Sequence, residues 1–427
     1  MLGIFTSLLT LCFLVIAPLR VEGQPQPAPD THSHAFRVIG YFNEDAARAG
    51  RYQVKDIQTS GAARLLTHID YAFGKVAGNR CEIANPAVAL EQGYDAAASV
   101  DGTDDPAGDR QLRGTFHQLQ ELKRLHPKIK LLISLGGWGQ SGGFSSAVQP
   151  DNLHDFVESC INIFIRGQFA GGITAPGIFD GIDIDWEYPV IGGVEPGQPE
   201  DNANFTAMAA EFRRQLDAVK PGFLLTAALP AEGEYYSNFQ LKRVTRFMDF
   251  LSIMAYDLHW NSEPLTAFHS ALFHDPKDTT DPRLHDRYGD FAVQGFLRAQ
   301  VLPSKIVFGV PFYGKGWAGV EDVNHGLYQK AQGQATSSGS YRDLKQLPET
   351  ADRHYYPTVA SCTVWNDQTF WSYDCPQSLR TKMKYIHAHH LGGVMFWELS
   401  HDTPDIELLR ILAAGKSVQD GLGKRVR

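Results

Sequence analysis

The chain has 427 residues, enough for one large domain or two, and its composition is that of a globular protein, with 43% hydrophobic and 20% charged residues. Its formal net charge of −9 argues against nucleic acid and against an anionic membrane surface as partners, because both are recognised by basic patches. We expect neither partner, and we expect the protein to be a monomer.

The N-terminus is typical of a targeting segment. The stretch Leu2–Leu19 is mostly apolar, and small or modest residues follow it. We expect a secretory signal peptide at residues 1–23 and a Pro-rich, disordered lead-in at residues 24–35, and therefore an extracellular protein. The alternative is an uncleaved anchor helix, but Pro18 and Arg20 shorten the apolar run below the roughly 20 residues that a membrane span needs.

Four cysteines remain after removal of the signal peptide, and they would lie in an oxidising compartment. Cys362 and Cys375 are close in the sequence and belong to one loop-rich region, so we expect a disulfide between them. Cys160 falls in a helical pattern, and we interpret it as a buried free thiol, although a pairing with Cys81 stays open.

Apolar strands alternate with amphipathic helices along the rest of the chain. The predicted strands are Arg37–Phe42, Thr67–Val76, Ile129–Leu135, the stretch Phe179–Pro189, Phe223–Leu229, Phe250–Tyr256, Lys305–Tyr313 and Gly393–Trp397. The predicted helices are Lys55–Leu66, Gln111–Leu125, Asn152–Gly167, Asp201–Val219, Phe239–Phe247, Ala292–Gln300, Pro376–His390 and Pro404–Ala413.

Eight strands that alternate with helices predict an α/β fold, a closed (β/α)8 TIM barrel at residues 36–427. An open, doubly wound sheet is the main alternative, but no Gly-rich phosphate-binding turn follows the first strand. The connection at residues 314–374 is too long for a bare loop. It contains short alternating runs at Gly326–Tyr328 and Thr369–Tyr373, so we predict a small α+β insertion after strand seven.

The fourth strand has an unusual pattern, because it reads F-D-G-I-D-I-D-W-E-Y-P. Three carboxylates alternate in it with three large apolar residues: Asp183, Asp185 and Glu187 with Ile182, Ile184 and Trp186. A solvated edge strand would explain an acidic face, but the other face is very apolar. A buried catalytic strand explains both faces, because barrel active sites lie at the carboxyl ends of the strands, where Glu187 stands.

Neighbouring carboxylates raise one another's pKa, so Glu187 can act as a general acid while Asp183 and Asp185 share a proton below it. Aromatic residues recur at the ends of other predicted strands, among them Tyr41, Phe73, Trp138, Tyr256 and Trp397. Each could be core packing, but their repeated placement suits the stacking of sugar rings.

A metal site is the rival use of clustered acids. No His stands at a ligand spacing that complements the acidic strand, so we expect neither a metal nor another cofactor.

Five stretches resemble glycoside hydrolase family 18, the chitinases. The family signature D-x-x-D-x-D-x-E is matched by Asp180, Asp183, Asp185 and Glu187. The other matching stretches are Ser134–Trp138 (S-x-G-G), Met254–Asp257 (M-x-Y-D), Pro311–Gly314 and Gly393–Glu398. The predicted insertion is similar to the α+β insertion of the subfamily with deep, tunnel-like clefts.

The resemblance implies a role for each matching residue. Glu187 would protonate the glycosidic oxygen, and the substrate's own 2-acetamido oxygen would be the nucleophile, giving an oxazolinium intermediate and net retention. Asp185 would orient the acetamido group, Asp183 would share a proton with Asp185, and Tyr256 would hydrogen-bond the acetamido oxygen. The implied substrate contacts are Trp397, Asp257, Met254, Trp138, Tyr41, Phe73 and Tyr188. The loop after Asp257 lacks the Gly that commonly precedes the family's Trp, so the place of Trp260 stays open.

The resemblance implies a secreted chitinase that hydrolyses β-1,4-linked N-acetylglucosamine polymers. An endo-β-N-acetylglucosaminidase acting on N-glycans would use the same chemistry. A chitin-binding lectin without turnover is the alternative from another class, but the chain keeps Glu187, which such lectins have lost.

Overall fold

The structure is a computed structural model that describes residues 36–106, 108, 111–336 and 339–423. The predicted signal peptide and lead-in, residues 1–35, lie outside the described residues. Among the helices that are described, each is too short or too polar to cross a membrane.

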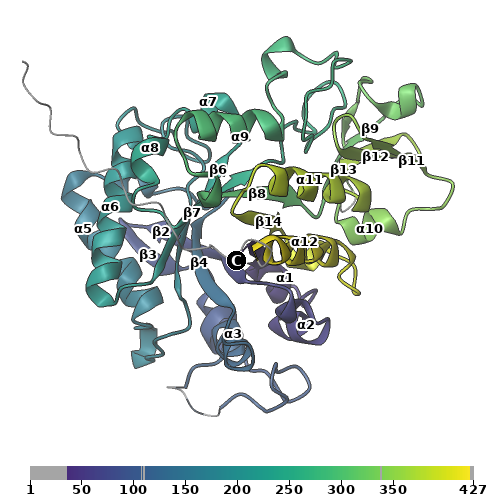
Figure 1. The fold of residues 1–427 in the computed structure, drawn as a ribbon. Helices are drawn as coiled ribbons and strands as arrows, with labels where there is room; N and C mark the ends of the chain where they lie inside the picture. Colours follow the sequence, from purple (N-terminus) through teal and green to yellow (C-terminus); the bar gives the residue numbers. More distant parts are fainter. Residues whose placement is uncertain (1–35, 107, 109–110, 337–338, 424–427) are drawn as a thin grey trace, which may run out of the picture. The chain divides into compact units, whose positions relative to one another are not determined.

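Eight parallel strands form a closed ring, so the predicted TIM barrel is confirmed (Figure 1). The strands are β1 (Arg37–Asn43), β2 (His68–Ala77), β4 (Lys130–Gly136), β5 (Gly181–Asp185), β6 (Leu224–Pro230), β7 (Phe250–Met254), β8 (Ile306–Pro311) and β14 (Gly393–Trp397). The ring closes because β1 pairs in parallel with both β14 and β2, with Val38 opposite Val394 and Gly40 opposite Ile69.

Helices connect the strands on the outside of the ring. The longer ones are α3 (Gly114–Leu125), α5 (Pro150–Cys160), α6 (Asp201–Val219), α9 (Gly289–Arg298), α11 (Pro376–Ala388) and α12 (Glu407–Gly423). The shorter ones are α1 (Glu44–Arg48), α2 (Val54–Thr59), α4 (Phe144–Ala147), α7 (Gly233–Tyr236), α8 (Leu241–Val244) and α10 (Tyr341–Lys345). Single turns of other helix types lie at Ala62–Arg64, Ala87–Glu91, Ile161–Ile165, Ala170–Gly172, Pro282–Leu284, Pro303–Lys305, Asn324–Gly326 and Leu399–His401.

Two predicted helices are interrupted rather than continuous. The helix expected at residues 55–66 ends at Thr59, because Gly61 adopts a left-handed conformation with φ of 84°, and it resumes as the turn Ala62–Arg64. The helix expected at residues 152–167 begins at Pro150, which suits a first helical position, and changes to a π-helical turn after Cys160.

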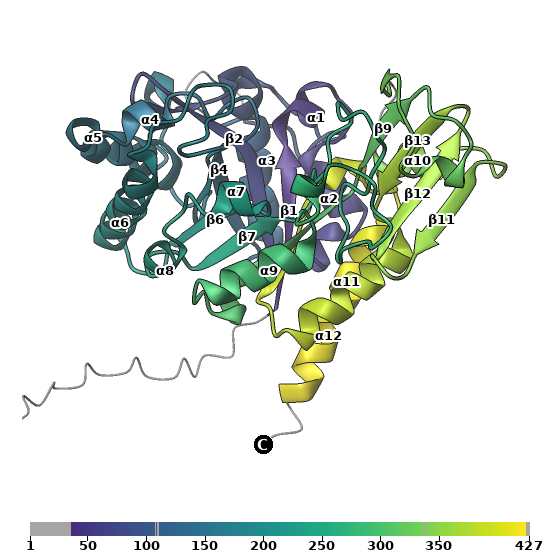
Figure 2. The same cartoon turned by 90° about the horizontal axis from the view of Figure 1, so that it is seen from above.

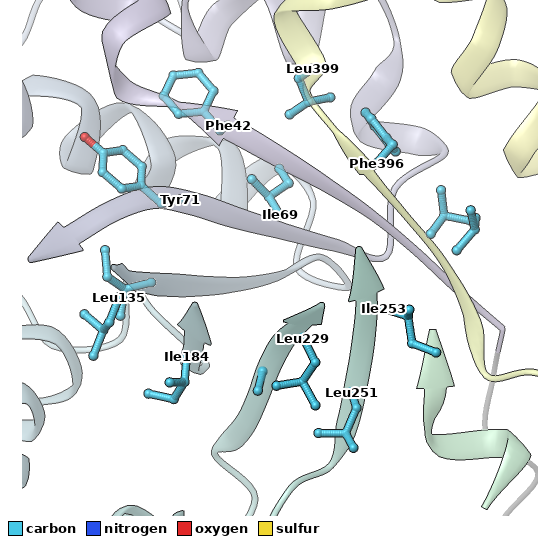
Figure 3. Close-up of a cluster of buried hydrophobic side chains, with 14 of the residues drawn as sticks. Phe42, Ile69, Tyr71, Leu135, Ile184, Leu229, Leu251, Ile253, Phe396 and Leu399 are labelled. Atoms are coloured by element: carbon cyan, nitrogen blue, oxygen red, sulfur yellow. The ribbon is translucent and has the colours of Figure 1, made fainter. Parts of the chain in front are cut away.

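The main apolar core lies between the ring of strands and the helices (Figure 3). Ile182 and Ile184 of β5 are fully buried in this layer, with Leu251 and Phe396 from other strands. Burial of such side chains stabilises the fold by roughly 1.5–3 kcal/mol each, which offsets the cost of the carboxylates on the opposite face of β5. The acidic strand therefore alternates because it is a barrel strand, with its apolar residues on the outer face and its carboxylates on the inner face.

The segment between β8 and β14 carries a second, antiparallel sheet, as predicted (Figure 2). Its strands lie in the order β10 (Gly333–Gln334), β9 (Gly314–Ala318), β13 (Thr369–Tyr373), β12 (Ser361–Asn366) and β11 (Asp352–Tyr356). The run at residues 369–373 is strand β13, whereas the run at 326–328 is not a strand, because the turn Asn324–Gly326 overlaps its start.

The long connection after β7 completes the core of this second sheet. Phe268 and Ala271 from that connection pack with Trp317, Val359 and Phe370 of the insertion. The β7–α9 connection and the insertion thus share one apolar cluster, although about fifty residues separate Phe268 from Trp317 in the sequence.

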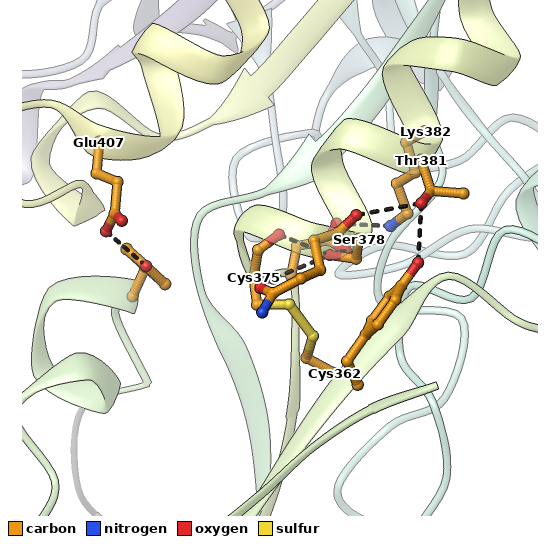
Figure 4. Close-up of a disulfide and its surroundings, with 10 residues drawn as sticks. Cys362, Cys375, Ser378, Thr381, Lys382 and Glu407 are labelled. Carbon is orange, nitrogen blue, oxygen red and sulfur yellow. Dashed lines mark hydrogen bonds and ion pairs between the residues drawn. A yellow bond between two sulfur atoms is a disulfide. The ribbon is translucent and has the colours of Figure 1, made fainter. Parts of the chain in front are cut away.

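The structure contains two disulfides. The predicted Cys362–Cys375 pair is confirmed and joins β12 to the start of α11 (Figure 4). The interpretation of Cys160 as a free thiol is wrong, because Cys160 is bonded to Cys81. Cys81 lies on β3 (Arg80–Ile83), a short strand that turns back antiparallel to β2 and packs against α5, and this hairpin brings the two cysteines together.

Candidate active site

Asp183 lies in the barrel interior and accepts hydrogen bonds from three strands. Its donors are Ser134 Oγ at 2.8 Å, Thr226 Oγ1 at 2.6 Å and Tyr41 Oη at 2.9 Å. Ser134 and Thr226 are its register partners on the two neighbouring strands, so the sheet itself brings them together. Burial raises the pKa of Asp183, and the hydrogen bonds oppose that rise because they favour the charged form.

Asp185 lies one step nearer the rim on the same face of β5. Its side chain is buried, and its Oδ1 has no hydrogen-bond partner among the described residues. Burial, together with the charges of Glu187 and Asp183, holds the pKa of Asp185 well above its usual range. A proton shared between neighbouring carboxyl groups is the state that such an arrangement favours at neutral pH.

Glu187 follows the end of β5 and reaches the pocket above it. Its backbone N–H donates to Ser141 Oγ at 3.0 Å, and Ser141 donates to the Asp185 carbonyl at 3.0 Å. Burial raises the pKa of Glu187 to about 7 against the effect of a hydrogen bond from Tyr188, and the negative charges of Asp257 and Glu232 add to the rise. A carboxyl group with this pKa can deliver a proton near neutral pH.

Two glycines let the loop after β4 approach these acids. Gly136 and Gly137 have φ of 104° and 82°, which other residues rarely adopt. A Cβ on Gly136 would lie 2.3 Å from the Asp185 carbonyl oxygen, and one on Gly137 would lie 2.4 Å from the Phe73 ring. The close contact explains why the S-x-G-G stretch requires glycine at both positions.

The fourth acid of the signature, Asp180, has a different position. Its carboxylate accepts the Leu131 N–H at 3.0 Å and pairs with Lys123 at 2.8 Å, before the start of β5. Asp180 therefore anchors the strand from the amino end and does not enter the pocket.

A cavity of about 330 Å³ opens above the acids at the carboxyl ends of the strands. Of the eleven site residues predicted from the sequence, ten line it and Asp183 lies beneath. The lining residues are Tyr41, Phe73, Trp138, Asp185, Glu187, Tyr188, Glu232, Tyr235, Met254, Tyr256, Asp257, Trp260, Arg287, Tyr313, Lys315 and Trp397.

Aromatic side chains form two parts of the cavity wall. The Trp397 ring stacks on Phe73 with centroids 5.6 Å apart and lies 5.4 Å from the Tyr41 ring. At the entrance, Trp138 is 58% exposed and packs against Trp260, 5.3 Å away. The sequence left the place of Trp260 open, and the structure places it in the cavity wall, in contact with Trp138.

Asp257 links the barrel to the insertion inside the cavity. It accepts the Tyr313 hydroxyl at 2.6 Å and pairs with Lys315 Nζ at 3.1 Å. Burial acts to raise the pKa of Asp257, but contacts with His269, Lys315 and Tyr313 outweigh it and lower the pKa. Asp257 is thus an anion, and Tyr256 beside it directs its hydroxyl to Met395 Sδ at 3.7 Å.

Sequence reasoning missed several residues of the site. Four further lining residues stand outside the quoted motifs: Glu232 and Arg287 in connections, Tyr235 on α7 and Lys315 on β9. Asp70 of β2 is also missed, although its position on the strand gave a signal, since it alternates with the apolar residues Ile69 and Tyr71 that face the outer core.

Asp70 is fully buried, and neither of its carboxylate oxygens has a hydrogen-bond partner among the described residues. Burial and the charge of Asp183 hold the pKa of Asp70 well above its usual range. Both effects favour the neutral form of Asp70, which extends the column of carboxyl groups below Asp183.

Groups of three side chains that could hold a metal ion occur in the described part of the chain, but none includes an acid of β5.

A barrel that presents an acid of raised pKa at the foot of an aromatic cleft suits a glycoside hydrolase, since the aromatic faces suit sugar rings and the acid suits a glycosidic oxygen. Comparison with known families specifies this class further. The family model of the glycosyl hydrolases family 18 matches residues 37–402, so the chain belongs to that family.

Individual relatives share much of the chain. Chitinase 63 of Streptomyces plicatus is 32% identical over 408 residues, which is 92% of this chain and 62% of the relative. The catalytic domain of a psychrophilic chitinase B from Arthrobacter TAD20 is 32% identical, with a TM-score of 0.83, over 90% of this chain and 96% of that domain. A family 18 N-acetylglucosaminidase from Paenibacillus barengoltzii is 29% identical, with a TM-score of 0.70, over 89% of this chain and 99% of that one. The chain spans about three fifths of the length of this Streptomyces chitinase and of two further curated relatives, chitinase C of Streptomyces lividans and chitinase A1 of Niallia circulans.

Proposed function

We propose that the protein is a chitinase, which hydrolyses β-1,4 linkages between N-acetylglucosamine units. The observation that carries the proposal is the position of Glu187, whose pKa is raised to about 7, between the buried acids of β5 and the aromatic cavity. The similarity to the two chitinases named above supports the choice of substrate.

Glu187 donates its proton to the glycosidic oxygen as the bond to the anomeric carbon breaks. The acetamido oxygen of the same sugar bonds to that carbon from the opposite face and forms an oxazolinium ion. Glu187, now a carboxylate, takes a proton from the water that opens this ion, so the configuration is retained. The family resemblance supports this sequence of steps, which requires no enzyme nucleophile.

Asp185 orients the acetamido group and stabilises the positive charge that develops on it. In the resting site Asp183 accepts three hydrogen bonds, so it is the better stabilised anion and the shared proton lies with Asp185. As positive charge develops on the acetamido group, this proton moves to Asp183, and Asp185 stabilises the charge as a carboxylate. Tyr256 hydrogen-bonds the acetamido oxygen in this proposal. Trp397 forms the floor under the reacting sugar, and its stacking on Phe73 holds the ring in place.

The remaining predicted contacts have roles along the sugar chain. Trp138 and Trp260 at the entrance offer apolar faces to further sugar units, and Asp257, Met254, Tyr41 and Tyr188 contact the units next to the cleaved bond.

Purified protein incubated with chitin hexamer tests the proposal. The wild type should release shorter oligomers, and Glu187→Gln should bind the hexamer equally well but turn it over about 10²–10⁴ times more slowly, because only the proton is lost. Binding without product would identify a lectin. Cleavage of an N-glycan core with no cleavage of the hexamer would identify an endo-β-N-acetylglucosaminidase. Either result would contradict the proposal.

A second candidate is the removal of single N-acetylglucosamine units, which the likeness to the Paenibacillus N-acetylglucosaminidase favours. In that case the hexamer would yield monosaccharide and pentamer as the first products, whereas a chitinase would yield larger fragments.

Secretion forms part of the proposal. Two disulfides are typical of an oxidising compartment, and the apolar N-terminus is typical of a signal peptide. N-terminal sequencing of protein recovered from culture medium would test it, with a start near residue 24 expected.

A further inference from the structure

Three metal-ligand side chains meet on the insertion, away from the cavity. His325 belongs to the turn Asn324–Gly326, and Asp352 and His354 stand two apart on β11, so the last two project from the same face of the strand. None of the three lines the active-site cavity. The cluster therefore has no part in the hydrolysis proposed above.

The two imidazoles converge on one carboxylate. His325 Nδ1 lies 2.8 Å from Asp352 Oδ2, and His354 Nε2 lies 2.6 Å from Asp352 Oδ1. The two rings are in van der Waals contact, with centroids 3.6 Å apart. The ligand atoms all lie within 4.8 Å of one another, so modest rotations of these side chains would bring them to the roughly 3.4 Å that separates ligands of a tetrahedral zinc ion with bonds of about 2.0–2.1 Å.

We propose that His325, Asp352 and His354 bind a divalent transition-metal ion of the zinc type. Two imidazoles and one carboxylate suit Zn²⁺, whereas Ca²⁺ and Mg²⁺ require more oxygen ligands than one carboxylate supplies. Three protein ligands leave a fourth position to water. The side chains are 34–47% exposed, so the ion can enter from solvent without unfolding of the sheet.

The electrostatics of the cluster favour a cation. Arg353, the residue between the two β11 ligands, points elsewhere, because its guanidinium donates to the carbonyls of Leu344 and Leu347. In the described structure, the ion pairs of Asp352 involve the two histidines and no lysine or arginine.

The position of the cluster gives the ion a structural role. β11 lies at one edge of the second sheet, and β9 and β10 lie toward the opposite edge. His325 belongs to the connection between β9 and β10, and its contact with Asp352 brings this connection to β11. An ion held by both segments would fix this connection to β11, and its binding free energy would add to the stability of the folded protein.

Titration of metal-free, tag-free full-length protein with ZnCl2 by calorimetry tests the site. We expect one ion bound at this site at neutral pH, with the affinity reduced at least about tenfold by Asp352→Asn and lost in the double variant His325→Ala/His354→Ala. Zn²⁺ should raise the melting temperature of the wild type and not that of the double variant.

The matched control is His154→Ala, which alters the exposed group His154, Asp155 and Glu158 on α5. This control should retain the zinc affinity of the wild type. A wild type that binds no zinc, or a double variant that binds it as tightly as the wild type, would overturn the proposal. Circular dichroism and hydrolysis of chitin hexamer check that each variant is folded, since the cluster is separate from the cavity.

Discussion

At the scale of single residues, the site depends on how far each carboxyl group is from water. Asp183 and Asp70 are fully buried, while Glu187 borders the cavity and keeps some exposure. Burial raises the pKa of all three, but only Glu187 can pass its proton to a molecule in the cavity. The distance of each acid from the rim therefore separates the proton donor from the groups that support it.

The pKa of Glu187 predicts the basic limb of the pH profile. Glu187 acts in its protonated form, so kcat/KM should fall as the pH rises through about 7. Burial raises the pKa of Glu232 to about 7 as well, so Glu232 carries its negative charge over the upper part of this limb. Glu232→Gln removes that charge, so the limb should move to lower pH. A single charge in a partly solvated pocket contributes about 1 kcal/mol, which corresponds to a shift of less than about one pH unit.

Profiles of kcat/KM against pH for the wild type and Glu232→Gln measure this shift. Glu349→Gln, an exposed change in the insertion, is the control and should leave the limb unmoved. A limb that moves to higher pH in Glu232→Gln would contradict the electrostatic explanation.

At the scale of elements, the two-residue repeat of side chains along a strand determined which residues could be assigned to one face from the sequence. The alternation along β5 placed Asp183, Asp185 and Glu187 on one face correctly, because two residues always return to the same side. The motif stretches placed eight of the ten predicted cavity residues, and the aromatic residues of the first two predicted strands gave the other two, Tyr41 and Phe73. Lys315 on β9 and Arg287 in the β7–α9 connection were missed, because their approach to the cavity depends on tertiary contacts that leave no local pattern in the sequence.

The two disulfides likewise differ in whether their pairing could be predicted from the sequence. Cys362 and Cys375 are close in the sequence, so their pairing could be predicted. The Cys81–Cys160 pairing depends on the β3 hairpin, a four-residue strand with no apolar run of its own.

The Cys81–Cys160 disulfide should stabilise the fold more than the other one. It spans 79 residues and Cys362–Cys375 spans 13, so chain entropy predicts contributions of about 4.5 and about 3 kcal/mol. Denaturant unfolding of Cys81→Ala/Cys160→Ala and of Cys362→Ala/Cys375→Ala measures the two losses. The reverse order would show that loop closure does not dominate, and a free thiol at Cys160 in the native protein would contradict the pairing itself.

Asp70 on β2 gives a prediction about stability and pH. Its pKa is raised in the folded state, so its contribution favours folding below its ordinary pKa and is lost as the pH rises toward the folded-state value. Asp70→Asn cannot ionise, so the variant should gain stability relative to the wild type as the pH rises. Melting temperatures measured from about pH 4 to about pH 8 test this. A wild-type advantage that grows with pH would show that Asp70 is ionised and paired in the native protein.

At the scale of the whole molecule, the barrel and the second sheet form the cavity together. Lys315 on β9 pairs with Asp257 after β7, and its ammonium lies 4.2 Å from the Trp260 ring centroid. The sequence predicted the barrel and the insertion because both follow from the order of elements. The shared apolar cluster between the β7–α9 connection and the insertion could not be predicted, because it joins segments without repeating patterns. This cluster holds one wall of the cavity in place.

The configuration of the first product tests the proposed mechanism of this cavity most directly. Chitin hexamer should be digested briefly and the anomers of the new reducing ends separated before they equilibrate. Attack by the acetamido group, with Glu187 as the only acid and base, predicts that the new reducing ends appear first as the β-anomer. An initial α-anomer would mean direct attack by water on the anomeric carbon, and it would contradict the assignment of the substrate as its own nucleophile.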